Sequence, residues 1–305
     1  MDQDNLFDSF LPPAMAQKAE DTGVRKANQP FIKIFLLSVL AGAFVALGGI
    51  FSTTILAGSS ALPYGVARLL SGLAFCLGLI LVVIGGAELF TGNNLIVMAW
   101  ASRKVTTAAL LRNWAIVYLG NFVGSLATAL LMLLAKQYLS GGGSVGETAL
   151  KIAASKTQLG FVQAVALGVL CNGLVCLAVW LTYSARTTGD KILAVLFPVS
   201  AFVAAGFEHS VANMYFIPFG LLIQQFDPAF VASLGDKVHL SGLTWGAFLL
   251  NLLPVTIGNI IGGSGLVGAV YWMIYLSGAK RVEIVHSNGN GKQKVQAKSK
   301  STLIQ

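Results

Sequence analysis

The sequence predicts an all-α integral membrane protein whose six transmembrane helices form two related halves. Three observations indicate this class. The 305-residue chain is 55% hydrophobic and only 10% charged, whereas soluble domains have roughly 25% charged residues. Its apolar residues gather in runs that reach the roughly 20 residues a helix needs to cross a bilayer. Two polar motifs each occur twice, in the same order, which indicates an internal repeat.

Six apolar runs are the expected transmembrane helices. They are rich in Gly, Ala and Leu without alternating polar residues, which favours helices over the strands of an outer-membrane barrel. The runs are Phe35 to Leu56, Leu69 to Trp100, Trp114 to Leu134, Phe161 to Tyr183, Ile192 to Leu222 and Trp245 to Leu276. They define an N-terminal cytoplasmic segment at 1–30 and a transmembrane domain at 31–278. Residues 279–305, rich in Gly, Ser, Asn and spaced Lys, are expected to form a disordered cytoplasmic tail.

The distribution of Lys and Arg predicts the orientation. Most of the 20 basic residues fall on the side that holds both termini. The other side carries Arg68, Lys136, Lys151, Lys156 and Lys237. Because basic loops stay on the cytoplasmic side of an inner membrane, both termini are expected to be cytoplasmic. The net charge of +8 then faces anionic lipid, and no nucleic-acid partner is expected.

An inverted repeat is expected from the order of the polar motifs. Glu88 is followed five residues later by Asn93, and Glu208 likewise by Asn213. The third run contains Asn113 and Gly120-Asn121-Phe-Val-Gly124, and the sixth contains Asn251 and Gly258-Asn259-Ile-Ile-Gly262. A unit of three spans inserts upside down when it is repeated, so a 3+3 inverted repeat is predicted, with units at about 31–139 and 158–278.

The second and fifth runs are too long for single spans and are expected to be broken. GGAELFTGNN (Gly85 to Asn94) and AAGFEHSVAN (Ala204 to Asn213) combine glycines with polar residues that satisfy unwound backbone. The sixth run is also long and holds Pro254, so a tilted or kinked helix is the alternative there.

The buried acidic residues have an expected scaffold role. A charged side chain at the bilayer centre costs about 2.5 to 3.5 kcal/mol or more. We expect Glu88 and Glu208, with Asn93 and Asn213, to hold the helix breaks by capping half-helices or accepting hydrogen bonds from unwound backbone. A fixed negative charge facing a pore would repel an anion.

His209 is the candidate for chemistry. Its counterpart in the first repeat is Leu89, so the histidine departs from the symmetry. An imidazole donates a hydrogen bond or a proton near neutral pH, and the alternative is a packed histidine bonded to backbone. Thr91 and Asn172 offer neutral donors that suit weak anion binding, the alternative being bonds between helices. The His and Cys residues lack metal-ligand spacing, so no metal or cofactor is expected.

Four segments resemble the formate/nitrite transporter family. They are VIGGAELFTG (Val83 to Gly92), CNGLVCLAVW (Cys171 to Trp180), GFEHSVANM (Gly206 to Met214) and LLPVTIGNIIGG (Leu252 to Gly263). The resemblance runs from about Leu6 to Ser277. It implies an aquaporin-like six-helix protomer, in a homopentamer with one pore per protomer.

The resemblance also implies roles for residues at matching positions. His209, Thr91 and Asn172 would line the substrate pathway, and Lys156 would attract anions at the periplasmic mouth. The apolar constrictions would involve Phe75, Leu79, Leu89, Phe90, Val175 and Phe202. The anion would cross as a neutral acid or with a proton, with His209 as the proton donor.

The expected function is a passive or proton-coupled channel for formate across the inner membrane. The N-terminal residues and FPVSAFVAAGFEHSVANM look most like formate channels, whereas TGNN after Phe90 leans toward nitrite members and Gly173 is smaller than usual. Nitrite and hydrosulfide are therefore alternative substrates. A water or glycerol channel would carry paired Asn-Pro-Ala motifs, which this chain lacks. A membrane hydrolase using Glu208, His209 and Ser210 is the third alternative.

Overall fold

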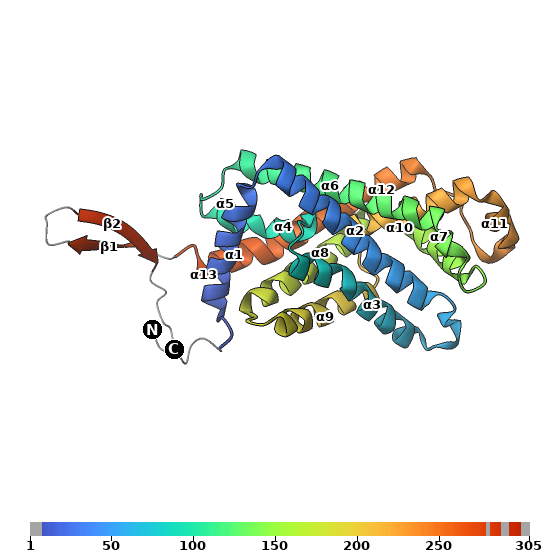
Figure 1. Ribbon diagram of the computed structural model, residues 1–305, viewed down its shortest axis with the longest axis horizontal. Coiled ribbons are helices and arrows are strands. Elements are labelled where there is room, and N and C mark those ends of the chain that lie inside the picture. Colours follow the sequence, from blue (N-terminus) through green and yellow to red (C-terminus); the bar gives the residue numbers. More distant parts are fainter. Residues whose placement is uncertain (1–7, 279–280, 288–292, 300–305) are drawn as a thin grey trace.

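The computed structural model describes residues 8–278, 281–287 and 293–299 (Figure 1). The first half of the chain forms α1 (Pro12–Ala27), α2 (Phe31–Leu56), η2 (Ser59–Ala61), α3 (Tyr64–Gly85), α4 (Phe90–Asn93), η3 (Asn94–Ile96), α5 (Val97–Ala101) and α6 (Thr107–Leu134). The second half forms η4 (Gln137–Leu139), α7 (Ser144–Thr157), α8 (Phe161–Ser184), α9 (Thr188–Ala204), α10 (Ser210–Phe226), α11 (Pro228–Ser233), η5 (Gly235–Lys237), α12 (Trp245–Ile260), η6 (Ile261–Ala269) and α13 (Val270–Tyr275). The strands β1 (Arg281–Ser287) and β2 (Gln293–Ser299) pair antiparallel.

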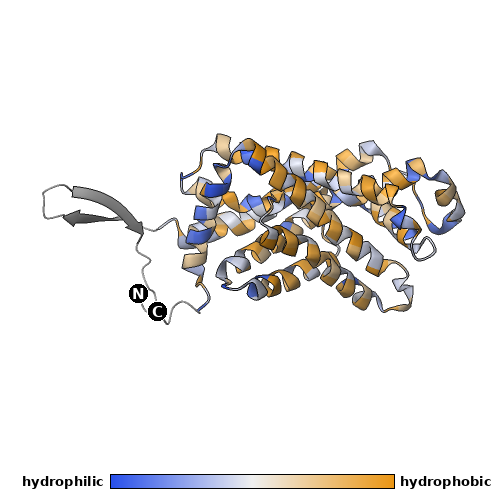
Figure 2. Ribbon diagram, viewed as in Figure 1, coloured by the Kyte–Doolittle hydropathy of each residue, from blue (hydrophilic) through white to orange (hydrophobic). Residues whose placement is uncertain are grey.

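Five helices within the described residues are long and apolar enough to cross a membrane. They are α2, α3, α6, α8 and the continuous helix Trp245–Tyr275. The fifth expected span is missing from this set because it is divided into α9 and α10, of 17 residues each. Apolar residues predominate along the helices of the bundle (Figure 2). The chain is therefore a membrane protein with several apolar helices.

Both long runs are broken at their glutamates, as the sequence predicts. After α3 and after α9 the chain leaves the helical conformation, and α4 and α10 then begin beyond each break. Each break contains a glycine with positive φ, 76° at Gly86 and 75° at Gly206. Glycine adopts this conformation without the clash that a Cβ would cause. The sequence thus places each break at residues that tolerate it.

Two helix pairs form the framework of the bundle. α2 packs along α6, and α8 packs along the helix formed by α12 and η6. A Cβ at Gly124 of α6 would lie 2.0 Å from the carbonyl oxygen of Val39, and a Cβ at Gly262 would lie 2.1 Å from that of Val169. Small residues allow such close backbone approach between transmembrane helices. The two pairs use glycine at equivalent positions, as the repeated motifs predict.

The sixth run is a continuous helix with a widened segment. Pro254 lies within α12, and the following nine residues, η6, form a π-helix. The sequence left open a break or a single tilted or kinked helix, and the structure shows a single unbroken helix with wider turns. Such π-helical turns are frequent at functional sites.

The ends of the bundle hold the polar segments. α1 and α5 lie at one end, and α7 and α11 lie at the other (Figure 1). The expected cytoplasmic segment 1–30 therefore contains a helix. The expected disordered tail differs from the structure over 281–287 and 293–299, whose backbones pair from Arg281 with Ser299 to Ser287 with Gln293. The tail's other residues, 279–280, 288–292 and 300–305, lie outside the described residues.

Tyr138 and Asp227 join two loops at the α11 end, outside the membrane-spanning helices. Tyr138 Oη donates to Asp227 Oδ2 at 2.6 Å, and Asp227 Oδ1 accepts the Phe230 N–H at 3.0 Å, which caps α11. The bond from Tyr138 is the main cause that lowers the pKa of Asp227. The same bond raises the pKa of Tyr138 to about 12.

We expect this link to stabilise the protein at neutral pH and to weaken in acid. The pKa of Asp227 is lower in the folded than in the unfolded state, so its contribution is present above the unfolded value of 3.8 and lost as the pH falls further. Tyr138→Phe should lower the melting temperature by about 3 °C at pH 7 and by clearly less at pH 3. Thermal unfolding in detergent checks this, and equal losses at both pH values would contradict it.

Candidate functional site

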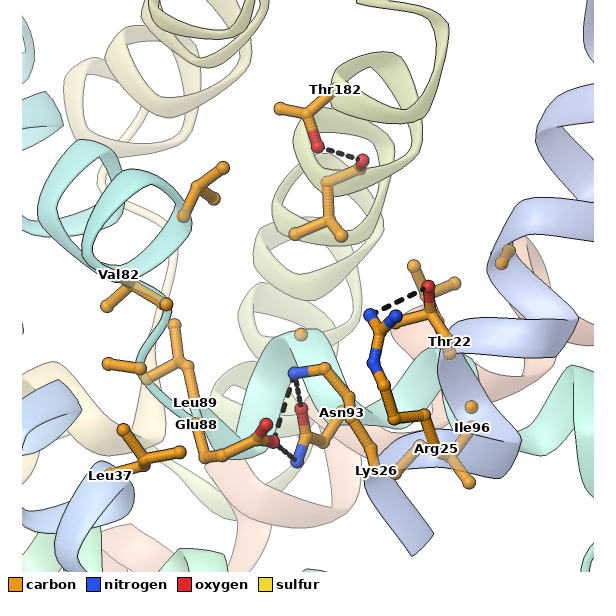
Figure 3. Close-up of a pocket in the computed structure, with 18 of the residues that line it drawn as sticks. Thr22, Arg25, Lys26, Leu37, Val82, Glu88, Leu89, Asn93, Ile96 and Thr182 are labelled. Carbon is orange, nitrogen blue, oxygen red and sulfur yellow. Dashed lines mark hydrogen bonds and ion pairs between the residues drawn. The ribbon is translucent and has the colours of Figure 1, made fainter. Parts of the chain in front are cut away.

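Two cavities approach the helix breaks from opposite ends of the bundle. The Lys26 vestibule, of about 310 Å³, lies between α1, α3 and α8 (Figure 3). Its charged lining residues are Arg25, Lys26, Lys33 and Glu88. The Lys156 vestibule, of about 170 Å³, lies beside α7 and the second break. Its charged lining residues are Arg68, Lys156 and Glu208.

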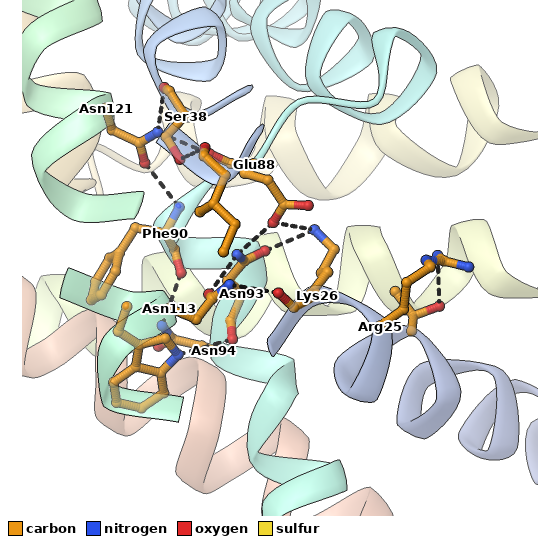
Figure 4. A network of polar contacts seen from close by, with 12 residues as sticks. Arg25, Lys26, Ser38, Glu88, Phe90, Asn93, Asn94, Asn113 and Asn121 are labelled. Carbon is orange, nitrogen blue, oxygen red and sulfur yellow. Dashed lines mark hydrogen bonds and ion pairs between the residues drawn. The ribbon is translucent and has the colours of Figure 1, made fainter. Parts of the chain in front are cut away.

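A buried polar cluster holds the first break. Lys26 Nζ donates to Glu88 Oε2 at 3.0 Å and to Asn93 Oδ1 at 2.8 Å. Asn93 Nδ2 donates to Glu88 Oε2 at 2.7 Å and to Asn113 Oδ1 at 3.0 Å. Figure 3 shows Lys26, Glu88 and Asn93 pointing toward one another, and Figure 4 shows Asn113 beside them. The Glu88 charge is thereby paired inside the bundle.

The same cluster recurs at the second break. Lys156 Nζ donates to Glu208 Oε1 at 2.7 Å, and Asn213 Nδ2 donates to Glu208 Oε2 at 2.7 Å. Asn213 Nδ2 also donates to Asn251 Oδ1 at 2.8 Å, and Asn251 Nδ2 donates to the Lys156 carbonyl at 2.8 Å. The two clusters join the same kinds of residue in the same order, with two differences. Lys26 and Asn93 share Glu88 Oε2, whereas Lys156 and Asn213 contact different oxygens of Glu208, and only Lys26, among the described contacts, also bonds its asparagine. Each lysine neutralises its glutamate, so neither carboxylate presents an unpaired negative charge to the pathway.

The unwound backbone is held by asparagines, which corrects the expected role of the glutamates. Asn121 Oδ1 accepts the Phe90 N–H at 2.9 Å, and its Nδ2 donates to the Glu88 carbonyl at 2.9 Å (Figure 4). Asn259 does the same for Ser210 N–H and the Glu208 carbonyl, at 2.9 and 3.0 Å. An amide has both an acceptor and donors and can serve both sides of a break, whereas a carboxylate only accepts.

His209 and Thr91 meet between the two breaks. His209 is 4% exposed and precedes α10, and Thr91 is fully buried in α4. His209 Nδ1 accepts the Ala212 N–H at 3.1 Å, so this nitrogen carries no proton in the bond. The neutral ring then carries its proton on Nε2, which lies 3.1 Å from Thr91 Oγ1. The Nε2–H therefore donates to Thr91 Oγ1, and the Thr91 hydroxyl proton is left as a neutral donor at the junction of the half-helices.

Asn172 is a positioning residue in this geometry. Its Nδ2 lies 2.7 Å from the Asn259 carbonyl, 3.1 Å from Asn94 Oδ1 and 3.3 Å from the Thr91 carbonyl. Two amide protons serve these three acceptors, so few donors remain for a passing anion. A Cβ at Gly263, in the π-helix, would lie 2.3 Å from this Nδ2. The widened segment with its glycine therefore makes room for the Asn172 amide.

Four of the six expected constriction residues flank the His209–Thr91 pair. Leu79 and Leu89 line the Lys26 vestibule, and Phe75 and Phe202 line the Lys156 vestibule. The Phe75 and Phe202 rings pack edge to face at 5.8 Å, and Phe202 stacks on His209 at 6.0 Å. Both vestibules therefore end at apolar side chains.

Phe90 and Val175 line neither vestibule, so their expected place in the constrictions stays a prediction. The Phe90 ring packs against Tyr118 at 5.0 Å and against Trp114 at 6.1 Å, both on α6, and it lines neither vestibule. The preceding Leu89 lines the Lys26 vestibule instead. Val175 is 1% exposed in the core and also lines neither vestibule.

Similarity to known proteins identifies the family of this chain. The family model described as formate/nitrite transporter matches residues 13–273. The chain belongs to the formate/nitrite transporter family. It is 47% identical to the formate channel FocA of Escherichia coli strain K12 over 90% of this chain and 98% of the relative. It is 39% identical to a probable formate transporter of Methanothermobacter thermautotrophicus, over 88% and 98% respectively.

Two solved structures resemble this formate/nitrite transporter. A pentameric formate channel with formate bound is 45% identical, with a TM-score of 0.76 over 81% of this chain and 98% of that one. An FNT family ion channel is 30% identical, with a TM-score of 0.73 over 85% and 98%. The family predicted from four sequence segments is confirmed by these comparisons.

Sequence reasoning missed Lys26 in this formate/nitrite transporter. Lys26 stands five residues before Phe31 at the start of α2, and Lys156 stands five residues before Phe161 at the start of α8. The expected repeat units began after both lysines, so the correspondence was not seen. The clusters show that α1 and α7 contribute equivalent lysines to the two halves.

Proposed function

We propose that the protein is a channel for formate and similar small monovalent anions. The proposal rests mainly on the neutral His209–Thr91 pair, which lies between two apolar constrictions and is reached from two positively charged vestibules. The Lys26 vestibule has three cations and one carboxylate, and the Lys156 vestibule has two cations and one carboxylate. Vestibules of one sign concentrate anions at a pore. The relatives named as formate channels support formate as the substrate.

The residues along this pathway act one after another as the anion passes. The net positive charge of each vestibule draws in the anion, while Glu88 and Glu208 stay paired with their lysines and bonded to Asn93 and Asn213. The anion loses hydration water at the apolar side chains Phe75, Leu79, Leu89 and Phe202. The Thr91 hydroxyl replaces part of that hydration, as does the His209 Nε2–H when it exchanges Thr91 Oγ1 for the anion. Weak neutral donors release the anion again.

Proton donation by His209 has a structural requirement. The neutral ring cannot give up its Nε2 proton without becoming an anion, so the ring must first take a second proton on Nδ1. That step breaks the bond from the Ala212 N–H, which is 3.1 Å long and caps α10. We propose proton-coupled passage through this doubly protonated ring, with passive hydrogen bonding as the alternative.

The architecture and setting of the channel are part of the proposal. Matching clusters at the two breaks support the inverted 3+3 repeat, with α9 and α10 together forming the fifth span. The distribution of Lys and Arg supports an inner membrane with cytoplasmic termini and places Lys156 on the periplasmic side. The similar solved structure, a pentameric formate channel, supports a homopentamer with one pore in each protomer. A hydrolase finds no support, because within the described residues Ser210 Oγ has no hydrogen-bond partner that could activate it.

Stopped-flow flux into proteoliposomes tests the function. Formate, nitrite, hydrosulfide and glycerol are compared at pH 5.5 and 7.5. Formate should pass fastest, and faster at pH 5.5 if a proton accompanies it. His209→Asn keeps an acceptor for the Ala212 N–H but cannot take a second proton, so it should reduce formate flux about tenfold and flatten the pH profile. Rapid glycerol flux, unaffected by this variant, would overturn the proposal.

The exposed His239 provides the matched control. His239→Asn removes a histidine that lines neither vestibule and should leave flux and pH profile unchanged. An equal effect of both variants would show that His209 has no special role.

A further inference from the structure

Arg68 lies at the beginning of α3 and reaches the end of α9. Its Nε donates to the Ala204 carbonyl at 3.1 Å, and its Nη2 donates to the Val203 carbonyl at 2.5 Å. These are the last carbonyls of α9, directly before the second break. The C-terminus of a helix carries roughly half a negative charge. The guanidinium therefore covers the negative end of the half-helix that faces the Lys156 vestibule.

Arg68 departs from the repeat in the same way as His209. Counted back from the two glutamates, the position equivalent to Arg68 is Thr188, which is exposed at the start of α9. At the first break, α3 ends instead in the left-handed Gly86, whose own backbone N–H donates to the Val82 carbonyl. Arg68 and His209 both line the Lys156 vestibule. The asymmetry of the two halves is thus concentrated at one mouth of the pathway.

The net positive charge of the Lys156 vestibule comes from Arg68. Lys156 is paired with Glu208 at 2.7 Å, so these two charges largely cancel. No ion pair involves Arg68 within the part of the chain that the structure describes. Without the guanidinium the charged lining side chains would sum to zero, and the exposed end of α9 would repel an anion.

We propose that Arg68 is a second anion-attracting residue of this pathway, which masks the α9 terminus and concentrates small monovalent anions beside His209. This inference rests on the proposed channel function. The net positive charge of the Lys156 vestibule then belongs to Arg68, because the charge of Lys156 is paired with the Glu208 carboxylate. The Lys26 vestibule has its own excess of cations, so the effect of Arg68 is confined to one direction of flux.

Recordings from single assembled channels in planar bilayers test this assignment. Formate is added to one side and then to the other, and the concentration giving half-maximal current is measured for each direction. Arg68→Gln keeps a donor for the α9 carbonyls and loses the charge. It should raise one of the two half-maximal concentrations about fivefold, weaken its dependence on ionic strength, and leave the other unchanged. Arg68→Lys should retain wild-type values in both directions.

Lys237→Gln removes an exposed charge that lines neither vestibule and should change neither value. If Arg68→Gln does not assemble, Arg68→His replaces it. This variant is purified at pH 5.5, where the imidazole is charged, inserted into the bilayer, and then measured at pH 5.5 and at pH 8, where the imidazole is neutral. Wild type is measured at both pH values, and at pH 8 the variant should need more formate than wild type for half-maximal current in one direction. Formate currents with wild-type concentration dependence in both uncharged variants would overturn the assignment of Arg68. Absence of formate current in wild type would instead overturn the channel function.

Discussion

Gly262→Ala is expected to destabilise the protein by about 3 kcal/mol or more and to prevent correct assembly. The new Cβ would lie 2.1 Å from the Val169 carbonyl oxygen and 2.9 Å from its carbonyl carbon. Backbone atoms cannot swing aside as a side chain does, so α8 and the α12–η6 helix would have to separate. Their separation would also remove the Asn259 amide from the second break, because Asn259 lies one turn before Gly262. Size-exclusion chromatography and thermal unfolding in detergent measure the loss.

Gly265→Ala is the matched control in the same π-helical segment. A Cβ at Gly265 meets nothing within 4 Å. This variant should assemble and melt within about 2 °C of wild type. Similar behaviour of the two variants would show that backbone contact at Gly262 does not hold the helix pair.

Glu208→Ala is the second large expected effect, with a loss of about 3–5 kcal/mol and poor assembly. The side chain of Glu208 is 5% exposed and that of its partner Lys156 is 15% exposed. Removal of the carboxylate leaves a nearly buried ammonium without its counter-charge and removes one of the two acceptors of Asn213 Nδ2. Melting temperature and the yield of assembled protein report the loss. Normal yield, stability and flux in this variant would contradict the scaffold role.

Two further variants separate charge from structure at this position. Glu147→Ala breaks an exposed pair with Lys151 and should change stability by less than about 0.5 kcal/mol. The double variant Glu208→Gln with Lys156→Met removes both charges and retains an acceptor for Asn213. It should regain most of the stability lost in Glu208→Ala, because no buried charge is then unpaired.

Periodicity and composition were sufficient to predict the helices and their breaks. Uncharged runs of span length identified the apolar helices, and the glycines beside Glu88 and Glu208 located both interruptions. The sixth run was ambiguous, because Pro254 is compatible with a kink, a tilt or a break. Whether a proline breaks a helix depends on whether neighbouring groups satisfy the freed backbone, which packing decides.

The contacts within the site were predicted less well. The motif spacing identified Glu88, Asn93, Glu208 and Asn213, but the bonding partners were assigned to the wrong side chains. Asn121 and Asn259 hold the unwound backbone from other helices, at sequence separations that no local pattern reveals. The Phe90 ring packs on α6 while the preceding Leu89 lines the Lys26 vestibule, because neighbouring residues at the start of a helix point in different directions.

The sequence by itself determined the membrane class and the two breaks, and its motif order predicted the repeat, because hydropathy, glycine positions and motif order are properties of neighbouring residues. The tertiary structure alone decided which atoms meet. Lys26 and Lys156 become equivalent only when α1 and α7 dock against the breaks, and the tautomer of His209 follows from the Ala212 N–H that faces it. Arg68 acquires its place at the end of α9 because antiparallel packing joins residues 135 positions apart. Charge and hydrogen bonding depend on distance in space, which a linear pattern does not contain.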